Sequence, residues 1–351
     1  MAKSDNLRKA KEVKNDEFYT QLDDIVAEIA QHKDYVRQFQ GKTVFCNCDD
    51  PEWSSFVEFF RKFFKKLGLK KMICTHYEKD GSPSYKLEWS GEKIHGDTVN
   101  MIKTPLKGNG DFRSEECIEL LKEADIVVTN PPFSLFREYI AQLMEYDKKF
   151  VIIGNKNAIA YKEVFPLLRD GKMFVGYNAG NGTMHFATEV IDNKRIGAIT
   201  HSVPSYWYTN LDLDKSHEPL ILTKNYVGNE DKYPRYANFD AIECGHETKS
   251  GNWQGDLKMI PKDYFGRIGV PITYMAQHCA DQFDILGMGT GDLSKMLGAV
   301  PYNEILQGDA LARMRELRPN YGALFSIDEN GMPKLYYNRI IIQRKPVLQE
   351  D

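Results

Sequence analysis

The sequence lacks any long uninterrupted apolar run, and no apolar segment lies near its N-terminus. A membrane-spanning helix needs about 20 consecutive apolar residues, and a secretory signal carries its apolar stretch close to the start of the chain. These two absences predict a cytoplasmic protein with no membrane partner.

Paired cysteines are also missing. The chain has six cysteines, and no two of them have the C-x-x-C spacing that is typical of zinc sites. A reducing cytoplasm disfavours disulfides. We therefore predict no metal site and expect the cysteines to be small buried hydrophobic side chains.

No excess of positive charge marks the chain, because its net charge is −4. Overall charge therefore does not indicate a nucleic-acid-binding protein. Two local clusters are basic: Lys3, Arg8, Lys9, Lys11 and Lys14 near the N-terminus, and Arg61, Lys62, Lys65, Lys66, Lys70 and Lys71 further on. Either could meet phosphates, although charge alone favours a solvated face.

What is present is typical of a globular protein. The chain has 351 residues, of which 42% are hydrophobic and 27% are charged. This length predicts two domains, or one large domain with an appended piece, and it is sufficient for a sizeable core.

The first half alternates short apolar runs with amphipathic stretches. The pattern predicts strands over 43–48, 71–77, 125–129 and 149–154, and helices over 21–39, 51–66, 114–122 and 135–146. Strand, helix and strand at this spacing indicate βαβ units, a parallel sheet and a doubly wound α/β domain. Residues 80–105 predict a β-hairpin insertion.

The second half changes character from Phe174 onward, where aromatics, glycines and short β-like runs such as 205–209 dominate. Aromatic residues interleaved with Lys and Arg suit a surface that reads nucleic acid, and an irregular small core has the same composition. We expect the sheet domain to end near residue 215.

One stretch organises the first half, the predicted strand 125–129 with the four residues that follow it. Two prolines end the strand, because neither has an N–H to donate and both fix φ. Asn130 then lies at the carboxyl end of a parallel strand, where open α/β sheets hold their ligands.

This motif suits chemistry on a planar exocyclic amino group, which has two N–H donors in fixed directions. The Asn130 side-chain oxygen can accept one hydrogen bond and the Pro131 carbonyl the other, which raises the nucleophilicity of the nitrogen. Phe133 offers a ring on which the base can stack. An ordinary strand-ending turn uses the same residue types, so the tetrapeptide alone leaves both interpretations open.

The end of the first predicted strand has the position of a nucleotide site but not its glycines. Residues 46–51 read Cys-Asn-Cys-Asp-Asp-Pro, so no dinucleotide-binding fingerprint is present. On this evidence alone, helix capping is the favoured interpretation of Asp49 and Asp50.

Several blocks carry a family resemblance that covers most of the chain: Asp16–Gln21, Phe45–Pro51, Gly110–Ser114 and Asp125–Tyr139, with weaker similarity at 209–212, 233–236 and 269–273. In this order they resemble the EcoRI-type adenine-specific DNA methyltransferases. The resemblance implies a Rossmann-like class I methyltransferase sheet with a C-terminal target-recognition region. The implied divisions are an N-terminal arm and helix (1–40), a catalytic domain (41–215) and a target-recognition region (216–351).

The resemblance further implies S-adenosylmethionine-dependent methylation of adenine N6 in a specific double-stranded DNA sequence, with base flipping. It assigns the target adenine to Asn130, Pro131, Pro132 and Phe133. The cofactor contacts that it implies are Phe18, Tyr19, Thr20, Asn47, Asp49, Asp50, Tyr77, Asp111 and Phe112. The choice between Asp49 and Asp50 stays open, as does that between Tyr77 and Glu78.

Two alternative functions keep parts of this pattern. Similar tetrapeptides occur in methyltransferases that act on guanine N2 of ribosomal RNA or on protein glutamine, and a catalytically silent DNA-binding protein could reuse the fold. The resemblance makes double-stranded DNA the expected partner and suggests a cognate restriction endonuclease as a functional one. An orphan or phage-borne methylase would have the same sequence features, and the oligomeric state is open.

Overall fold

The computed structural model describes residues 20–346 apart from 49, 96–97, 178–183, 188–199, 251, 290–295, 318, 320–322 and 337. The described chain divides into two compact units. The N-terminal unit contains the described residues up to Val164 together with Lys172–Asp214, and the C-terminal unit contains Phe165–Gly171 and the described residues from Lys215 onward. Among the described residues, no helix is long and apolar enough to cross a membrane.

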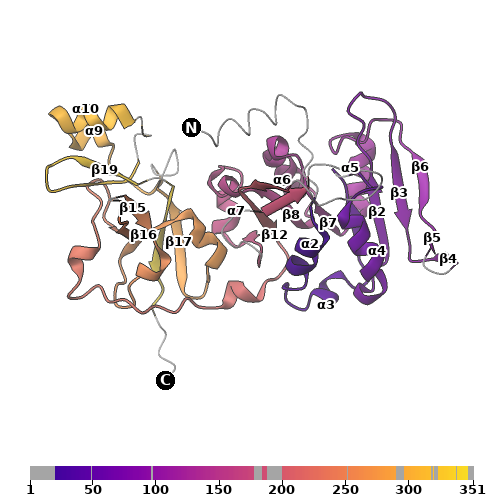
Figure 1. The fold of residues 1–351 in the computed structure, drawn as a ribbon, viewed down its shortest axis with the longest axis horizontal. Helices are drawn as coiled ribbons and strands as arrows, with labels where there is room; N and C mark the ends of the chain where they lie inside the picture. Colours follow the sequence, from indigo (N-terminus) through magenta and orange to yellow (C-terminus); the bar gives the residue numbers. More distant parts are fainter. Residues whose placement is uncertain are drawn as a thin grey trace, which may run out of the picture. The chain divides into compact units, whose positions relative to one another are not determined.

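An eight-stranded sheet in the order β6-β3-β2-β1-β7-β8-β12-β9 forms the N-terminal unit (Figure 1). Its strands are β1 (Thr43–Cys46), β2 (Lys71–Thr75), β3 (Tyr85–Trp89), β6 (Ile102–Pro105), β7 (Ile126–Thr129), β8 (Lys149–Asn155), β9 (Phe174–Val175) and β12 (Ser205–Thr209). The four central strands β2, β1, β7 and β8 are mutually parallel. The predicted doubly wound α/β class is therefore confirmed.

The predicted hairpin insertion over 80–105 is present and extends the main sheet. β3 pairs antiparallel with β2, and β6 pairs antiparallel with β3. Between them, β4 (Lys93–His95) and β5 (Thr98–Val99) form a small antiparallel pair. At the other side, β12 runs antiparallel between β8 and β9. A separate antiparallel pair is made by β10 (Met184–Ala187) and β11 (Thr200–Val203).

Three predicted helices are present with small shifts at their ends. They are α4 (Ser55–Leu67), α5 (Glu115–Glu123) and α6 (Phe136–Glu145). α4 begins later than predicted because Ser54 is its N-cap, accepting hydrogen bonds from the backbone N–H groups of residues 56 and 57. Gly68 ends the same helix in the left-handed conformation.

The predicted single helix over 21–39 is wrong, because the structure has two helices there, α2 (Leu22–Ile29) and α3 (Tyr35–Phe39). The break is fixed by contacts with a distant segment. The Lys33 N–H donates to the Asp212 carbonyl at 3.1 Å, and Asp34 adopts a left-handed φ of 43°. Local apolar spacing contains no information about that pairing.

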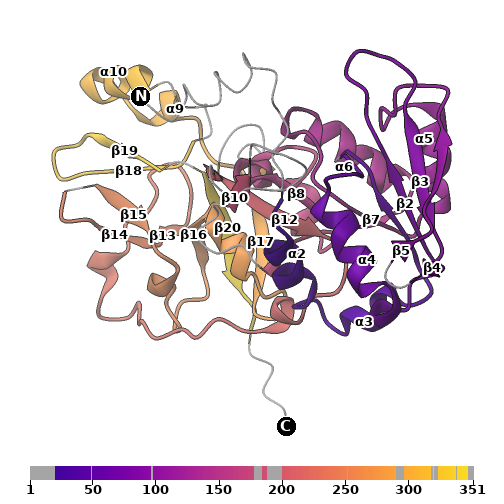
Figure 2. The same ribbon diagram turned by 45° about the vertical axis from the view of Figure 1, so that its right-hand side comes forward.

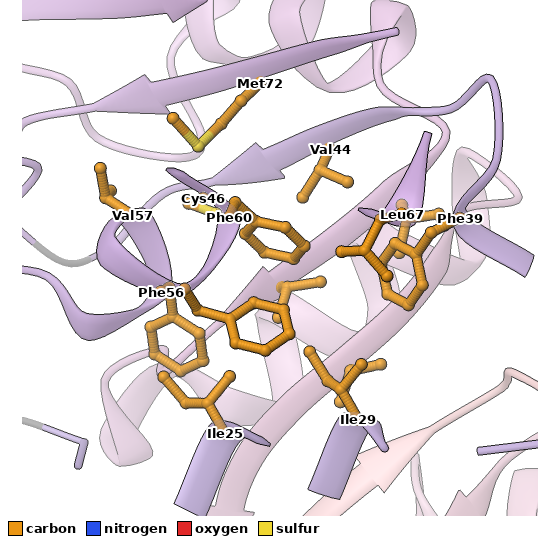
Figure 3. Close-up of a cluster of buried hydrophobic side chains, with 14 of the residues drawn as sticks. Ile25, Ile29, Phe39, Val44, Cys46, Phe56, Val57, Phe60, Leu67 and Met72 are labelled. Carbon is orange, nitrogen blue, oxygen red and sulfur yellow. The ribbon is translucent and has the colours of Figure 1, made fainter. Parts of the chain in front are cut away.

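The core of the N-terminal unit lies between the sheet and the helices α2 and α4. Ile25 and Ile29 of α2 face Phe56 of α4, and Phe60 lies close to Val44 of β1 (Figure 3). All five side chains are fully buried. The apolar face of α4 therefore holds both α2 and the parallel strands in place.

The C-terminal unit is built on a four-stranded sheet in the order β13-β16-β20-β17. Its strands are β13 (Ile242–Glu243), β16 (Arg267–Pro271), β17 (Phe283–Met288) and β20 (Arg339–Arg344). Two hairpins accompany it, made by β14 (Gly245–Glu247) with β15 (Trp253–Gly255) and by β18 (Phe325–Ile327) with β19 (Pro333–Leu335). The α-helices of this unit are α7 (Phe165–Arg169), α9 (Tyr302–Ile305) and α10 (Gly308–Leu317).

Short 3-10 helices occur in both halves of the described chain: η1 (Phe133–Leu135), η2 (Lys156–Ala160), η4 (Asp214–His217), η5 (Glu230–Lys232), η6 (Leu257–Met259) and η7 (Ile272–Gln277). Five of the six cysteines are buried, as predicted, and Cys48 is partly exposed. The basic N-terminal arm lies outside the described residues. In the second basic cluster, Lys62 pairs with Glu58 at 3.0 Å on α4, in accord with a solvated helix face.

Candidate active site

The sheet order creates a topological switch point between β1 and β7. The chain passes from β1 to β2 on one side of β1, and later returns to place β7 on its other side. In open α/β sheets, ligands bind outside the carboxyl ends of the strands at such a point. Asn47 directly follows β1, and Asn130 directly follows β7.

A buried polar network joins these two strand ends. The Thr129 hydroxyl donates to the Asn47 carbonyl, and the Tyr139 hydroxyl of α6 donates to the Asn47 side-chain oxygen. Asn47 is only 3% exposed, and burial raises the pKa of Tyr139 well above its usual value. Asn47, which the sequence predicts to contact the cofactor, thus accepts hydrogen bonds that join the ends of β1 and β7.

Residues 130–133 lie at the end of β7, where the sequence predicts them. Pro131 is buried, and Asn130 and Phe133 are partly exposed. Phe133 packs against the main core and opens η1, which continues into α6. The Oδ1 atom of Asn130 is buried, so the amide has to rotate before this oxygen can accept a hydrogen bond from a bound base.

The loop after β1 takes a glycine-like conformation without a glycine. Cys48 has a φ of 63°, in the left-handed region that glycine adopts most easily. Asp50 does not cap α4, because Ser54 does; instead, the Asp50 carboxylate accepts the Glu52 N–H at 2.9 Å in the preceding turn. The capping interpretation is therefore wrong for Asp50. Asp49 lies outside the described residues.

The end of β2 contributes a histidine that the sequence analysis missed. His76 Nδ1 lies 3.4 Å from an Asp50 carboxylate oxygen, and Nε2 lies 2.8 Å from Glu78 Oε1. The imidazole ring also stacks on Tyr85, with ring centroids 5.0 Å apart. His76 thus ties the end of β2 to the end of β1. The adjacent Tyr77 is 43% exposed, as a ligand-contacting ring would be.

The segment before α5 folds onto the end of β2. Gly110 has a φ of 80°, and a Cβ there would lie 1.9 Å from the His76 carbonyl oxygen, so only glycine fits. Asp111 follows and forms a two-pronged pair with Arg113, at 2.9 and 2.7 Å. These hydrogen bonds lower the pKa of Asp111. Phe112 is buried and meets the Tyr139 ring edge-on, with centroids 5.0 Å apart.

Thr20 brings the N-terminal segment to the start of α4. It is 2% exposed, and its carbonyl accepts the Ser55 hydroxyl at 2.6 Å. Its own hydroxyl oxygen is buried and has no hydrogen-bond partner among the residues that the structure describes. The two aromatic residues predicted to join it, Phe18 and Tyr19, lie outside the described residues.

Comparison with known proteins identifies the family. Residues 6–345 match the model of the adenine-specific methyltransferase EcoRI family. The chain belongs to this family. The type II methyltransferase M.EcoRI of Escherichia coli is 42% identical over 326 residues, which cover 86% of this chain and 95% of that protein.

Two mycoplasma relatives agree with this assignment. The type II methyltransferase M.MpnI of Mycoplasma pneumoniae is 37% identical and covers 79% of this chain and 84% of its own. The type II methyltransferase M.MgeORF184P of Mycoplasma genitalium is 36% identical, and the match covers 97% of this chain and 99% of that protein. The protein is an adenine-specific DNA methyltransferase. The guanine-N2, glutamine and catalytically silent alternatives are not favoured.

A methyltransferase of this family needs a methyl donor, and the switch point has features that fit one. The buried Thr20 hydroxyl lacks a hydrogen-bond partner among the described residues, as a group reserved for a ligand would. Asp111 supplies a carboxylate whose lone pairs exceed those that Arg113 uses. Tyr77 supplies an exposed ring at the end of the neighbouring strand.

Proposed function

We propose that this enzyme transfers the methyl group of S-adenosylmethionine to N6 of an adenine that has been flipped out of duplex DNA. The observation that carries the proposal is the position of residues 130–133 at the carboxyl end of β7, beside the end of β1. This is the place where an open parallel sheet holds its ligand. The family assignment supports adenine as the base.

The proposed grip on the target adenine uses three groups. The Asn130 side-chain oxygen, after rotation of its amide, and the Pro131 carbonyl accept the two N6 hydrogens. Pro131 is buried and Pro132 has a φ of −54°, so this backbone is held rigidly. The partly exposed Phe133 ring stacks on the base.

The cofactor is proposed to lie along the ends of β1 and β2. Thr20, Phe18 and Tyr19 are proposed to contact the methionine end, and either Asp49 or Asp50 is proposed to contact the cofactor at the end of β1. Tyr77 contacts the adenosine of the cofactor, and Asp111 accepts a hydrogen bond from the amino group of the cofactor's adenine. Phe112, which packs on Tyr139, holds this segment in position. Asn47 acts through the position of the β1 end, because Tyr139 already occupies its side-chain oxygen.

The chemistry needs alignment more than acid–base catalysis. When bound, S-adenosylmethionine supplies an electrophilic methyl group on a sulfonium. Asn130 and Pro131 would hold N6 facing that methyl group, the sulfur would keep the electron pair of the carbon–sulfur bond on transfer, and N6 would lose one proton to water. Asn130 and Pro131 stabilise the positive charge that develops on N6, as preorganised dipoles do.

The C-terminal unit is proposed to recognise the target sequence. The proposed divisions are 1–40, 41–215 and 216–351, and the contact boundary at Asp214 supports the second of the two borders. The type II designation of the relatives supports a cognate restriction endonuclease as a functional, non-physical partner. An enzyme that acts on DNA in this role is expected in the cytoplasm.

The test is the transfer of tritium from labelled S-adenosylmethionine into duplex DNA, followed by digestion to nucleosides. Wild-type enzyme should place the label in N6-methyladenine. Asn130→Ala should lower kcat on the order of 100-fold, the loss expected for one preorganised hydrogen-bonding group. Cofactor affinity and melting temperature should stay close to wild type.

Asn100→Ala is the matched control, because Asn100 is exposed and lies in the hairpin insertion, between β5 and β6. It should leave the rate unchanged. Label in ribosomal RNA or in protein, with none in DNA, would overturn the proposed substrate. Equal rates for Asn130→Ala and wild type would overturn the proposed role of Asn130.

A further inference from the structure

The C-terminal unit carries two antiparallel hairpins that differ in the chemistry of their tips. Figure 2 shows β14 with β15 and β18 with β19 projecting from the four-stranded sheet. A two-stranded ribbon of this kind fits the major groove of B-form DNA. The question is whether either hairpin is built to enter a groove.

The β14–β15 hairpin is anchored through Trp253, in the strand pair next to its tip, by a buried polar network. The Trp253 indole N–H donates to Glu243 at 3.0 Å, and Glu243 also accepts from the Arg339 guanidinium at 2.8 Å. Glu243 is fully buried and Arg339 is 8% exposed. Tyr236 donates its hydroxyl to the same carboxylate. Trp253 therefore holds the start of β15 in one position relative to β13 and β20.

The tip of this hairpin is organised by its own hydrogen bonds. The Thr248 N–H donates to the Asn252 carbonyl at 2.7 Å, which continues the ladder one pair beyond Glu247 and Trp253. The Thr248 and Ser250 hydroxyl oxygens lie 3.0 Å apart, and the Asn252 side-chain amide donates to Ser250 at 3.2 Å. The anchored Trp253 and the hydrogen bonds among Thr248, Ser250 and Asn252 together make the ribbon a preorganised element.

One face of the ribbon presents two amide side chains. The register places Gln254 opposite His246, and strand alternation puts Asn252 on the same face as Gln254. Asn252 and Gln254 are both exposed. Asn and Gln amides can form paired hydrogen bonds with the N6 and N7 atoms of adenine in the major groove.

Space and charge also favour this hairpin. A cavity of about 510 Å³ is lined by Thr248, Ser250 and residues 252–255 of the hairpin and by Leu335, Tyr336 and Arg339, which leaves room beside the ribbon. Residues 248–252 include Lys249 and no carboxylate, whereas residues 328–332, at the tip of β18–β19, include Asp328 and Glu329. Phosphates repel the second tip and attract the first.

We propose that the β14–β15 hairpin is the base-reading ribbon of this enzyme. Asn252 and Gln254 hydrogen-bond to base edges in the major groove, and Lys249 contacts a phosphate. The Glu243–Arg339 pair positions the ribbon through Trp253 and touches no base. This inference rests on the proposed function and names the element that gives it sequence specificity.

The experiment first maps the N6-methyladenine motif by sequencing the DNA of a host that expresses the wild-type enzyme and has no other adenine methylation. It then compares kcat/KM on the mapped duplex with kcat/KM on duplexes in which one base pair is exchanged. Gln254→Ala and Asn252→Ala should each relax discrimination at one position by about tenfold to a hundredfold. All other positions of the motif should be read as before.

Lys249→Ala is a second, independent test of the proposed DNA contact by the ribbon. It should weaken binding to every duplex alike and lower the slope of log Kd against log salt by about one. The matched control is Asn330→Ala, which removes an exposed amide from the tip of β18–β19. It should change neither the motif nor the salt slope.

The outcomes separate this inference from the function on which it rests. A wild-type enzyme that places no methyl group on DNA adenine would overturn both. The ribbon alone would be overturned by a different pair of results. The wild-type enzyme would have a clear motif, and the double variant Asn252→Ala/Gln254→Ala, with an unchanged melting temperature, would discriminate at every position of that motif as the wild type does. Gln254→Glu keeps the shape of the side chain, and it should shift preference at the same position as Gln254→Ala.

Discussion

Each of the two units buries a polar network, and the two networks differ in charge. In the N-terminal unit, Asn47, Thr129 and Tyr139 join the ends of β1 and β7 through neutral hydrogen bonds. In the C-terminal unit, Glu243 and Arg339 form a buried ion pair. The first network positions the strand ends that we propose for catalysis, and the second positions the hairpin that we propose for DNA recognition.

The difference in charge determines what each network costs when it is broken. A neutral network loses a hydrogen bond and leaves one polar group unsatisfied, which costs about 1–3 kcal/mol. A buried ion pair that loses one partner leaves an uncompensated charge, which costs about 3–5 kcal/mol. The C-terminal unit should therefore be the more sensitive to a single substitution in its network.

The largest effect is expected for Arg339→Met, which leaves the Glu243 carboxylate buried without its cation. The free energy of unfolding should fall by about 3–5 kcal/mol in urea titration. Adding Glu243→Gln should recover more than half of this loss, because it removes the buried charge and keeps one side-chain oxygen as an acceptor for Trp253. A loss of about 1–3 kcal/mol for Arg339→Met, the cost expected for the neutral network, would place the two networks in the same class.

The same variant should show a pH dependence that a neutral network lacks. Burial raises the pKa of Glu243 even in the presence of Arg339, and removal of the cation raises it further. A raised pKa in the folded state gives stability that is present below about pH 4.3 and is lost as the pH rises through the folded-state pKa. The deficit of Arg339→Met should thus grow from pH 4 toward pH 7.

Tyr139→Phe tests the neutral network and should have an intermediate effect. It removes the donor to the Asn47 side chain and should cost about 1–3 kcal/mol. The loss should be the same at pH 5 and pH 8, since burial keeps the pKa of Tyr139 well above this range. Urea titrations at both pH values measure it, and a deficit that changes with pH would show that the network carries charge.

Arg113→Gln should have the smallest effect on stability. Its pair with Asp111 is partly exposed, with side-chain exposures of 50% and 22%, so the loss should stay below about 1 kcal/mol. Hydrogen bonds from Arg113 lower the pKa of Asp111, so this stability is present above about pH 4 and is lost as the pH falls. Thermal melts at pH 3 and pH 7 should therefore differ less in Arg113→Gln than in wild type.

Local sequence patterns predicted the helices and strands whose bounds depend on neighbouring residues, and missed features that depend on distant segments. Short apolar runs predicted the parallel strands of the N-terminal unit, and the predicted helix over 114–122 corresponds to α5 (Glu115–Glu123). The break between α2 and α3 was missed because it depends on Asp212, far away in the chain. The loop-rich C-terminal unit offered no periodicity from which its sheet order could be derived.

The position of residues 130–133 was also predictable, because a strand followed by two prolines has to end there. The groups that support the switch point were not. From the sequence, Tyr139 is one residue of a predicted amphipathic helix, and His76 lies near the end of a predicted strand. Their contacts with Asn47 and Asp50 arise only when separate strands and helices come together.

The partial exposure of Cys48, in the loop after β1, has a practical consequence. Of the six cysteines, Cys48 is the one that is not buried, and it lies next to Tyr139 at the end of β1. A thiol-reactive fluorophore should therefore label the native enzyme at this single position. The unmodified sequence thus contains its own attachment point for an optical reporter of ligand binding at the switch point.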